Sequence, residues 1–316
     1  MNVFWIIFSI LCGILALFIL ISVAIYLIVF FVPNRSEKWL KSYHTPPGKI
    51  YDKYRPHMVE CMKEVRALPH KEFSIVSYDG IILKGKYYEC KPGAPIELMM
   101  HGYRGCAESD LSIGVKRAFE LGHNVLLVDH RSAGYSQGNI ITFGVKESVD
   151  CADWVKFIIN TFGFDVKIIL TGISMGASTA LIAAGKGLPE NVVGVIADCG
   201  YTSAEDIIKK ILKRIHLPIG MFYWIIKTTA KLFSGVNLDE ANAFKAIANC
   251  KIPVALFHGN NDQFVPHYMS EQNYNNCNSK KHLLIVEGAG HGLCYIFNKE
   301  GYIQTIKNLK ADCGLE

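Results

Sequence analysis

The sequence predicts an α/β domain built on a mostly parallel β-sheet, with an apolar helix in front of it. From about residue 71 to the C-terminus, short runs of β-branched and other apolar residues alternate with longer stretches of helical periodicity. Strands that are apolar at nearly every position are buried on both faces, which is typical of a parallel sheet with helices on each side. The residues before Pro33 differ in composition and form a segment of their own.

This N-terminal segment predicts a membrane anchor. No charged residue occurs from Val3 to Val32. As a helix this run would span roughly 45 Å, more than the ~30 Å hydrocarbon core of a bilayer. A cleaved signal peptide needs a basic n-region, a shorter apolar core and a small-residue cleavage site, and none is evident. We therefore expect residues 1–33 to form a retained transmembrane helix.

The flanking charges predict the orientation of this helix. Four basic residues follow the apolar run, namely Arg35, Lys38, Lys41 and Lys49. The positive-inside rule then places the rest of the chain in the cytoplasm. The ten cysteines include no C-x-x-C and no paired spacing, which is typical of a reducing compartment. We expect a single-pass membrane protein whose domain faces the cytoplasm.

The net charge of +5 is modest and gives no indication of a nucleic-acid partner. Basic residues concentrate between Ile207 and Leu238, where no carboxylate occurs. They are Lys209, Lys210, Lys213, Arg214, Lys227 and Lys231. Either they form a solvated helix face, or they attract an anionic membrane surface beside the anchor.

The elements of the domain follow in a regular order. Residues 34–70 are a polar, proline-containing connector that we expect to be partly helical, and residues 71–316 form the domain proper. Residues 73–89 read as two strands joined at Asp79-Gly80. Further strands are predicted at 96–100, 124–128, 167–171, 192–197, 253–257 and 282–286, with helices near 107–121, 146–160, 175–186, 267–276 and 295–310. The helical stretch 203–247 is unusually long for a connection, which predicts a cap.

The pattern G-x-S-x-G occurs twice, as GYSQG at 134–138 and GISMG at 172–176. Ser174 follows the apolar strand KIILT and precedes a helix of small residues, which is the context of a nucleophile elbow. This turn forces the serine toward positive φ and leaves no room for side chains at Gly172 and Gly176. Ser136 has neither the strand nor the helix, so we interpret GYSQG as a glycine-rich loop.

A nucleophilic serine needs a base and an acid that orients the base. His291, in EGAGHG after the last strand, is the predicted base, and Asp262, after the strand 253–257, is the predicted acid. The weaker alternatives are Asp198 for the acid and His258 or His267 for the base.

The oxyanion hole needs two backbone N–H groups directed at the developing charge. Met175, directly after the serine, would supply one. The second is assigned to Tyr103 in HGYRG, where Gly102 permits close approach of the backbone to the substrate. His101 is expected to brace this loop, since ligands at metal-binding spacing are missing. No metal and no cofactor are expected.

Seven motifs together carry a family resemblance: HGYRG, VDHRSAGYSQG, TFGVKESVDCADW, GISMGA, DCGYTS, HGNNDQFVP and GAGHG. From about Phe73 onward the chain resembles the α/β-hydrolase superfamily, most of all bacterial membrane-anchored serine hydrolases of the prolyl-oligopeptidase-like and ABHD-type branches. The resemblance implies an eight-stranded, mostly parallel sheet with helices on both faces and a short helical cap. It also implies that Asp129 and Arg131 brace the site. The family often has glycine where this chain has Ser132.

We therefore expect a membrane-anchored serine hydrolase that cleaves carboxylic esters or thioesters through an acyl-enzyme. Its substrate would be a small ester or an acylated lipid or protein. The cap segment LPIGMFYWII (217–226) either lines an acyl pocket or packs the cap on the core. A serine peptidase of the prolyl-oligopeptidase-like branch is the enzymatic alternative, and a non-catalytic binding module is disfavoured because the elbow, serine and histidine are all present.

Overall fold

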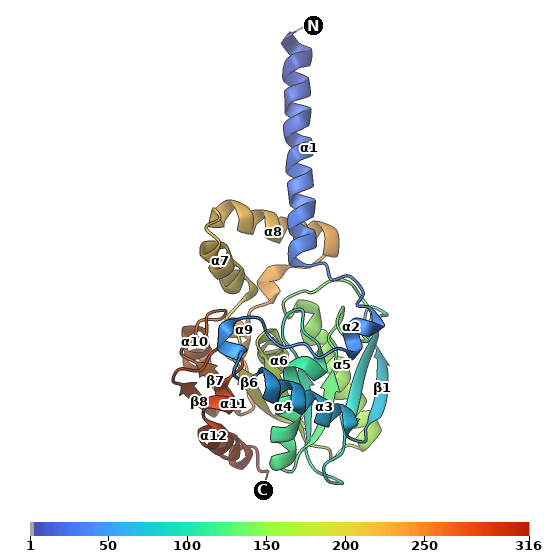
Figure 1. Cartoon of the computed structure of the whole chain (residues 1–316), viewed down its shortest axis with the longest axis vertical. Helices are drawn as coiled ribbons and strands as arrows, with labels where there is room; N and C mark the ends of the chain where they lie inside the picture. Colours follow the sequence, from blue (N-terminus) through green and yellow to red (C-terminus); the bar gives the residue numbers. More distant parts are fainter. Residues whose placement is uncertain (1–2, 316) are drawn as a thin grey trace.

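A long helix, α1 (Val3–Val29), projects from a domain built on a β-sheet in the computed structural model, which describes residues 3–315 (Figure 1). Its apolar side chains are exposed over most of its length and become buried only near its C-terminal end. By length and composition α1 is a candidate for crossing a membrane.

The sheet has eight strands in the order β1-β2-β4-β3-β5-β6-β7-β8. β2 pairs antiparallel with β1 and β4, and all other neighbours are parallel. This confirms the predicted eight-stranded, mostly parallel sheet. The strands are β1 (Lys71–Val76), β2 (Ile82–Tyr88), β3 (Ile96–Met100), β4 (Asn124–Val128), β5 (Ile168–Ile173), β6 (Val192–Asp198), β7 (Val254–Gly259) and β8 (Lys281–Val286).

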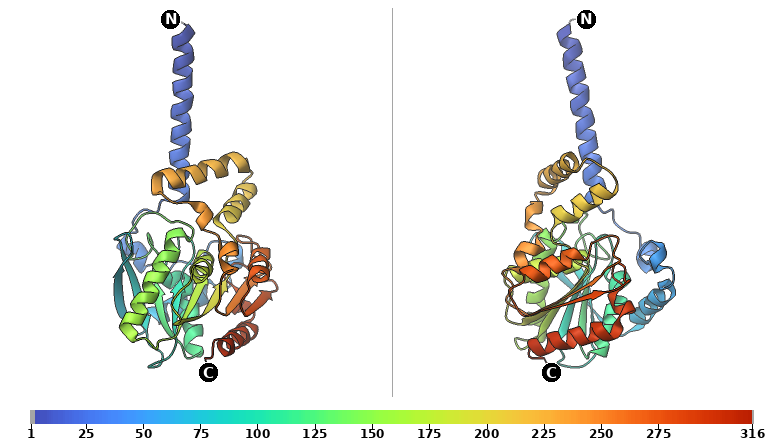
Figure 2. Two further views of the ribbon diagram at one scale, coloured as in Figure 1. Left: turned by 180° about the vertical axis from the view of Figure 1, so that it is seen from behind. Right: turned by 90° about the vertical axis from the view of Figure 1, so that its left-hand side faces the viewer.

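Helices cover both faces of the sheet, which is why the central strands are buried throughout (Figure 2). One face packs against α5 (Val145–Phe162), α6 (Met175–Gly185) and α10 (Tyr268–Asn276) around the buried Trp154 and Leu98. The other face packs against α4 (Ala107–Glu120), α11 (Cys294–Phe297) and α12 (Lys299–Asp312).

The cap is interrupted where a single helical stretch was expected over 203–247. It consists of α7 (Ala204–Arg214), α8 (Ile219–Ser234), the 3₁₀ turn η2 (Leu238–Glu240) and α9 (Ala243–Ile247). Pro218 stands directly before α8, and Gly235 ends it with φ +65°. Both residues are typical of helix boundaries. The predicted helix 295–310 is interrupted for a similar reason, because the Asn298 side chain caps α12 by accepting a hydrogen bond from Gly301 N–H.

The segment before the sheet folds against the domain. It contains α2 (Glu37–Lys41), the 3₁₀ turn η1 (Lys49–Tyr51) and α3 (Arg55–Ala67). Val65 of α3 is fully buried with residues of α4, and Tyr51 is buried beside α11 and α12. The predicted connector is therefore partly helical, and it packs as a layer on the domain.

Candidate active site

Ser174 lies in a tight turn between β5 and α6, with φ +55° and ψ −118°. A non-glycine residue with positive φ is strained, and the two neighbouring glycines allow the turn to close. A Cβ atom added at Gly172 would lie 2.2 Å from the Gly176 carbonyl oxygen. One added at Gly176 would lie 2.1 Å from the Met100 carbonyl oxygen. The backbone crowding therefore requires glycine at both positions.

Asp262 and His291 meet at the carboxyl edge of the sheet, because they follow the adjacent strands β7 and β8. His291 Nδ1 lies 2.6 Å from Asp262 Oδ2. The other carboxylate oxygen accepts hydrogen bonds from the backbone N–H groups of Phe264 (2.8 Å) and Val265 (2.9 Å). Burial opposes ionisation of Asp262, but hydrogen bonds from His258 and His291 hold its pKa well below the ordinary value. Asp262 is thus a carboxylate that can orient an imidazolium.

Asp198, the alternative acid, has a different environment at the end of β6. Its Oδ2 accepts a hydrogen bond from the Tyr302 hydroxyl at 3.2 Å. Burial raises the pKa of this carboxyl. Asp262, and not Asp198, occupies the position next to His291 Nδ1.

His258 contacts the same oxygen of Asp262, Oδ2, as His291 does, and it has no exposed surface. Its Nε2 is 2.9 Å from the Val265 carbonyl oxygen and 3.2 Å from Asp262 Oδ2, while Nδ1 is 2.6 Å from Ser270 Oγ. A carbonyl only accepts, so Nε2 carries the proton and Nδ1 accepts from the Ser270 hydroxyl. His258 thus holds the Asp262 carboxylate in place, a contact that the sequence did not predict.

The Nε2 atom of His291 lies 3.8 Å from the Cys199 thiol. Within residues 3–315 no hydrogen bond joins it to Ser174. Ligand atoms of Cys199, Asp262 and His291 lie within 4.8 Å of one another, close enough to hold a metal ion. However, burial raises the pKa of Cys199 well above its ordinary value, which disfavours the thiolate that a metal or a cysteine nucleophile requires.

The loop after β3 lies beside the serine. A Cβ atom at Gly102 would lie 3.5 Å from Ser174 Cβ, and Gly102 N–H donates to Asp110 Oδ2 at 2.9 Å. A hydrogen bond from Gly105 N–H to the Gly102 carbonyl (3.3 Å) closes the turn that contains Tyr103. Met175 begins α6, so its N–H has no partner inside the helix. Gly102, which precedes Tyr103, thus lies against Ser174, and Met175 follows Ser174 directly in the chain.

His101 joins this loop to the next one. Its Nδ1 lies 2.8 Å from the Gly102 carbonyl oxygen, and its Nε2 accepts a hydrogen bond from His130 N–H at 3.0 Å. The proton must therefore be on Nδ1. His101 is buried and connects the loops that follow β3 and β4.

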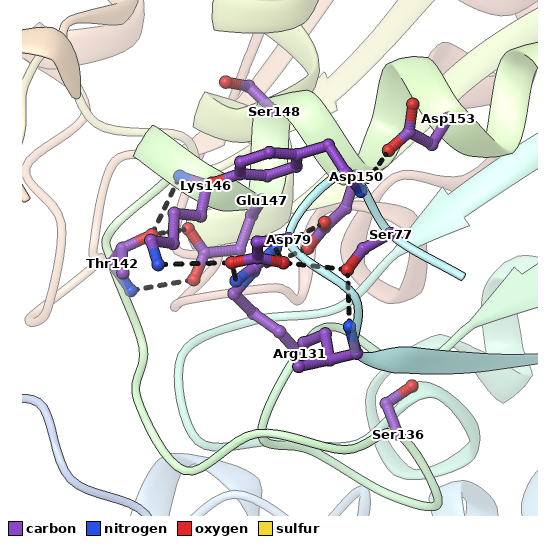
Figure 3. A network of polar contacts seen from close by, with 12 residues as sticks. Ser77, Asp79, Arg131, Ser136, Thr142, Lys146, Glu147, Ser148, Asp150 and Asp153 are labelled. Carbon is purple, nitrogen blue, oxygen red and sulfur yellow. Dashed lines mark hydrogen bonds and ion pairs between the residues drawn. The ribbon is translucent and has the colours of Figure 1, made fainter. Parts of the chain in front are cut away.

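Arg131, which precedes the GYSQG loop, lies in a network of charges and hydrogen bonds (Figure 3). Arg131 pairs with Asp150 through two contacts of 2.6 and 2.7 Å and also with Asp79 at 2.9 Å. The Ser136 hydroxyl donates to the Asp129 carbonyl (2.7 Å) and accepts from the Lys84 N–H (2.9 Å). Ser136 is therefore occupied by backbone groups and has no helix N-terminus behind it.

Two further positions in this loop follow from its backbone. The Asp129 carboxylate accepts from Ala107 N–H and Tyr135 N–H, both at 3.0 Å, so it joins the loop to the start of α4. Ser132 has φ +62°, a conformation that glycine adopts without strain. This explains why glycine is common there in the family that the chain resembles.

Comparisons with known proteins agree with this architecture. A family model described as the α/β hydrolase fold matches residues 98–222. The esterase Pf2001 of Pyrococcus furiosus superposes with a TM-score of 0.62 at 20% identity, covering 78% of this chain and 94% of the esterase. This chain is an α/β-hydrolase-fold protein. Est1E of Butyrivibrio proteoclasticus, solved with ferulic acid bound, superposes on this chain with a TM-score of 0.58 at 17% identity, covering 76% of this chain and 99% of Est1E.

The sequence relatives match a smaller part of this chain. The uncharacterized Bacillus subtilis protein YqkD is 30% identical over 189 residues, which are 60% of this chain and 62% of YqkD. The Escherichia coli protein YfhR is 25% identical over 175 residues, which are 54% of each chain. This chain thus spans less than two thirds of the length of these relatives.

Proposed function

We propose that this α/β hydrolase cleaves carboxylic ester or thioester bonds through Ser174, His291 and Asp262. The hydrogen bond of 2.6 Å between Asp262 and His291 Nδ1, at the same sheet edge as the Ser174 elbow, is the observation that carries this proposal. The esterase Pf2001 has the same fold, which supports an ester substrate.

The geometry supports an acyl-enzyme mechanism. Asp262 keeps the proton of His291 on Nδ1, so that Nε2 can take the proton of Ser174 as the hydroxyl attacks the substrate carbonyl. The Met175 and Tyr103 N–H groups stabilise the oxyanion of the tetrahedral intermediate. His291 then protonates the leaving alcohol or thiol. Water, deprotonated by His291, attacks the acyl-enzyme and releases the acid and free Ser174.

A fluorophosphonate probe tests this assignment, since it labels only an activated serine. We expect Ser174→Ala to abolish labelling of the full-length protein in detergent. Ser136→Ala is the matched control because it alters the other G-x-S-x-G motif, and it should leave labelling intact. Persistent labelling of Ser174→Ala would remove Ser174 as the nucleophile. A panel of p-nitrophenyl esters and aminoacyl p-nitroanilides then separates esterase from peptidase activity.

We also propose that α1 anchors the enzyme in a membrane and that the cap lies on the membrane surface. α8 runs across the foot of α1 (Figure 1), and its Trp224 ring centroid is 6.2 Å from that of Phe18. Met221, Trp224 and Leu232 are exposed at intervals that place them on one side of α8. An exposed apolar helix face beside a candidate membrane span is suited to the interfacial region of a bilayer.

The basic residues of the cap support attraction to an anionic leaflet, but they do so unequally. Lys209 forms an ion pair with Glu205, and Lys227 with Asp239. Lys213 and Lys231 are exposed and suit contact with lipid phosphate. With the domain in the cytoplasm, we expect esterase activity in nanodiscs to rise with anionic lipid content. The variant Lys213→Gln/Lys231→Gln should lose this rise, and equal rates in neutral and anionic nanodiscs would count against leaflet contact.

A further inference from the structure

The C-terminal end of α1 is bonded to the loop that carries Tyr103. The Tyr103 hydroxyl donates to the Val29 carbonyl at 2.6 Å. The Arg104 guanidinium donates from Nη2 to the carbonyls of Ile28 (2.6 Å) and Phe31 (2.9 Å). Carbonyl groups at the end of a helix have no partner inside it, and a cation there also interacts favourably with the helix dipole. Tyr103 and Arg104 therefore cap α1 from the domain side.

The same region is packed as well as hydrogen-bonded. Ile141 N–H donates to the Phe30 carbonyl (2.9 Å), and Val32 N–H donates to the Asn139 carbonyl (2.8 Å). The Phe143 ring lies 5.8 Å from the Phe30 ring and 5.3 Å from the Tyr103 ring, measured between centroids. Phe30, Val32 and Phe143 are buried in one cluster with α7 and α8. The end of α1 is thus docked in a fixed position on the domain.

The contact between the end of α1 and the domain lies next to the reacting serine, Ser174. The turn formed by residues 102–105 touches Ser174 through Gly102, which Asp110 holds from inside the domain. The outer side of the turn, Tyr103 and Arg104, is held by α1. Arg104 has φ +58°, a conformation that a non-glycine residue keeps only when its surroundings impose it. If α1 were displaced, the turn would lose its outer contacts and the Tyr103 N–H would change direction.

We propose that the end of α1 positions the oxyanion loop, residues 102–105, beside Ser174. Arg104 is the positioning residue, because it bonds this loop to the end of α1. Ester hydrolysis then depends on the anchor for catalysis as well as for location. This inference rests on the proposed function, in which Tyr103 N–H stabilises the oxyanion.

The substitution Arg104→Met in the full-length protein tests this inference, because it keeps an unbranched, flexible side chain and removes the guanidinium donors. Loss of an oxyanion donor lowers kcat by about 10²–10³-fold, and a misdirected donor should cost less. We expect kcat on a p-nitrophenyl ester to fall about 10–100-fold with KM nearly unchanged, since the contact acts on the transition state. Arg104→Lys, which can still donate to one carbonyl, should recover part of kcat.

Arg66→Met is the matched control. Arg66 also donates to backbone carbonyls, those of Leu40, Lys41 and Ser42, but it is bound to α2 and its C-terminal end instead of α1. We expect its kcat to stay at the wild-type value. Hydrogen exchange of amides 102–105 should accelerate in Arg104→Met alone, which reports the loop without relying on turnover.

The outcomes separate the two proposals. Wild-type kcat in a folded Arg104→Met protein overturns the positioning role, as does an equal loss in Arg66→Met. Both results leave the proposed function intact if Ser174 is still labelled by fluorophosphonate. A wild-type protein without labelling at Ser174 overturns the proposed function and the positioning role together.

Discussion

The substitution Asp262→Asn should move the proton of His291 to the wrong nitrogen. In the wild type, Asp262 Oδ1 accepts from two backbone N–H groups at 2.8 and 2.9 Å. The asparagine oxygen must take this place, so its NH₂ group occupies the position of Oδ2, 2.6 Å from His291 Nδ1. An amide NH₂ only donates, so His291 must present a bare Nδ1 and carry its proton on Nε2. In that form it cannot accept the proton of Ser174.

The expected loss is large. The wrong tautomer lowers kcat by about 10⁴-fold in a serine triad, which corresponds to about 5.4 kcal/mol of transition-state stabilisation. His258 Nε2, 3.2 Å from the same position, also carries a proton and does not favour an NH₂ group there. We therefore expect kcat to fall by roughly 10³–10⁴-fold, measured with a p-nitrophenyl ester on protein whose circular dichroism is unchanged.

Asp198→Asn is the matched control for this substitution. The Asp198 carboxyl accepts a hydrogen bond from the Tyr302 hydroxyl, and an asparagine oxygen can accept the same bond. We expect less than about a threefold effect on kcat, within the small cost of keeping one neutral hydrogen bond. A loss below tenfold for Asp262→Asn, or an equal loss for Asp198→Asn, would refute the assignment of Asp262 as the acid.

Three further predictions concern stability and support of the site. Despite burial, His258 and His291 lower the pKa of Asp262, so its contribution to folding is present above the unfolded carboxyl pKa of ~3.9 and is lost as pH falls below it. The difference in the free energy of unfolding in urea between wild type and Asp262→Asn should therefore shrink on acidification. A difference that stays constant with pH would contradict this. Glu97→Ala should lower the free energy of unfolding by about 3–5 kcal/mol, because it leaves the buried Arg117 without its two contacts of 2.7 Å. A loss of less than about 1 kcal/mol in a denaturant titration would count against this prediction. Tyr51→Phe should keep the fold and lower kcat several-fold, because it removes the hydrogen bond from the Tyr51 hydroxyl to the His291 carbonyl (2.9 Å), which supports the loop that carries His291. An unchanged kcat would show that this loop is held without the hydrogen bond.

Much of the fold could be predicted because strands and helices leave local periodic patterns. All eight strands lie where apolar runs predicted them, and the turn at Asp79-Gly80 joins β1 and β2 with Gly80 at φ +87°. The breaks in the cap depended on single residues, Pro218 and Gly235, inside an otherwise helical pattern. The pattern alone did not show where the helices would end.

By itself the sequence determined the elbow at Ser174, because a strand, a turn with two glycines and a helix are all local features. It also placed Asp262 and His291 after late strands, where a parallel sheet brings residues to one edge. Tertiary structure decided what depends on neighbours distant in the chain. It placed Asp262, and not Asp198, next to His291 Nδ1. It also brought His258 Nε2 into contact with the Asp262 carboxylate. It also seated the end of α1 on Tyr103 and Arg104, about seventy residues further along the chain. Every residue has the same backbone carbonyl group, so an apolar run does not indicate which side chains will donate to the carbonyls at its end. Only the folded chain could therefore reveal this contact.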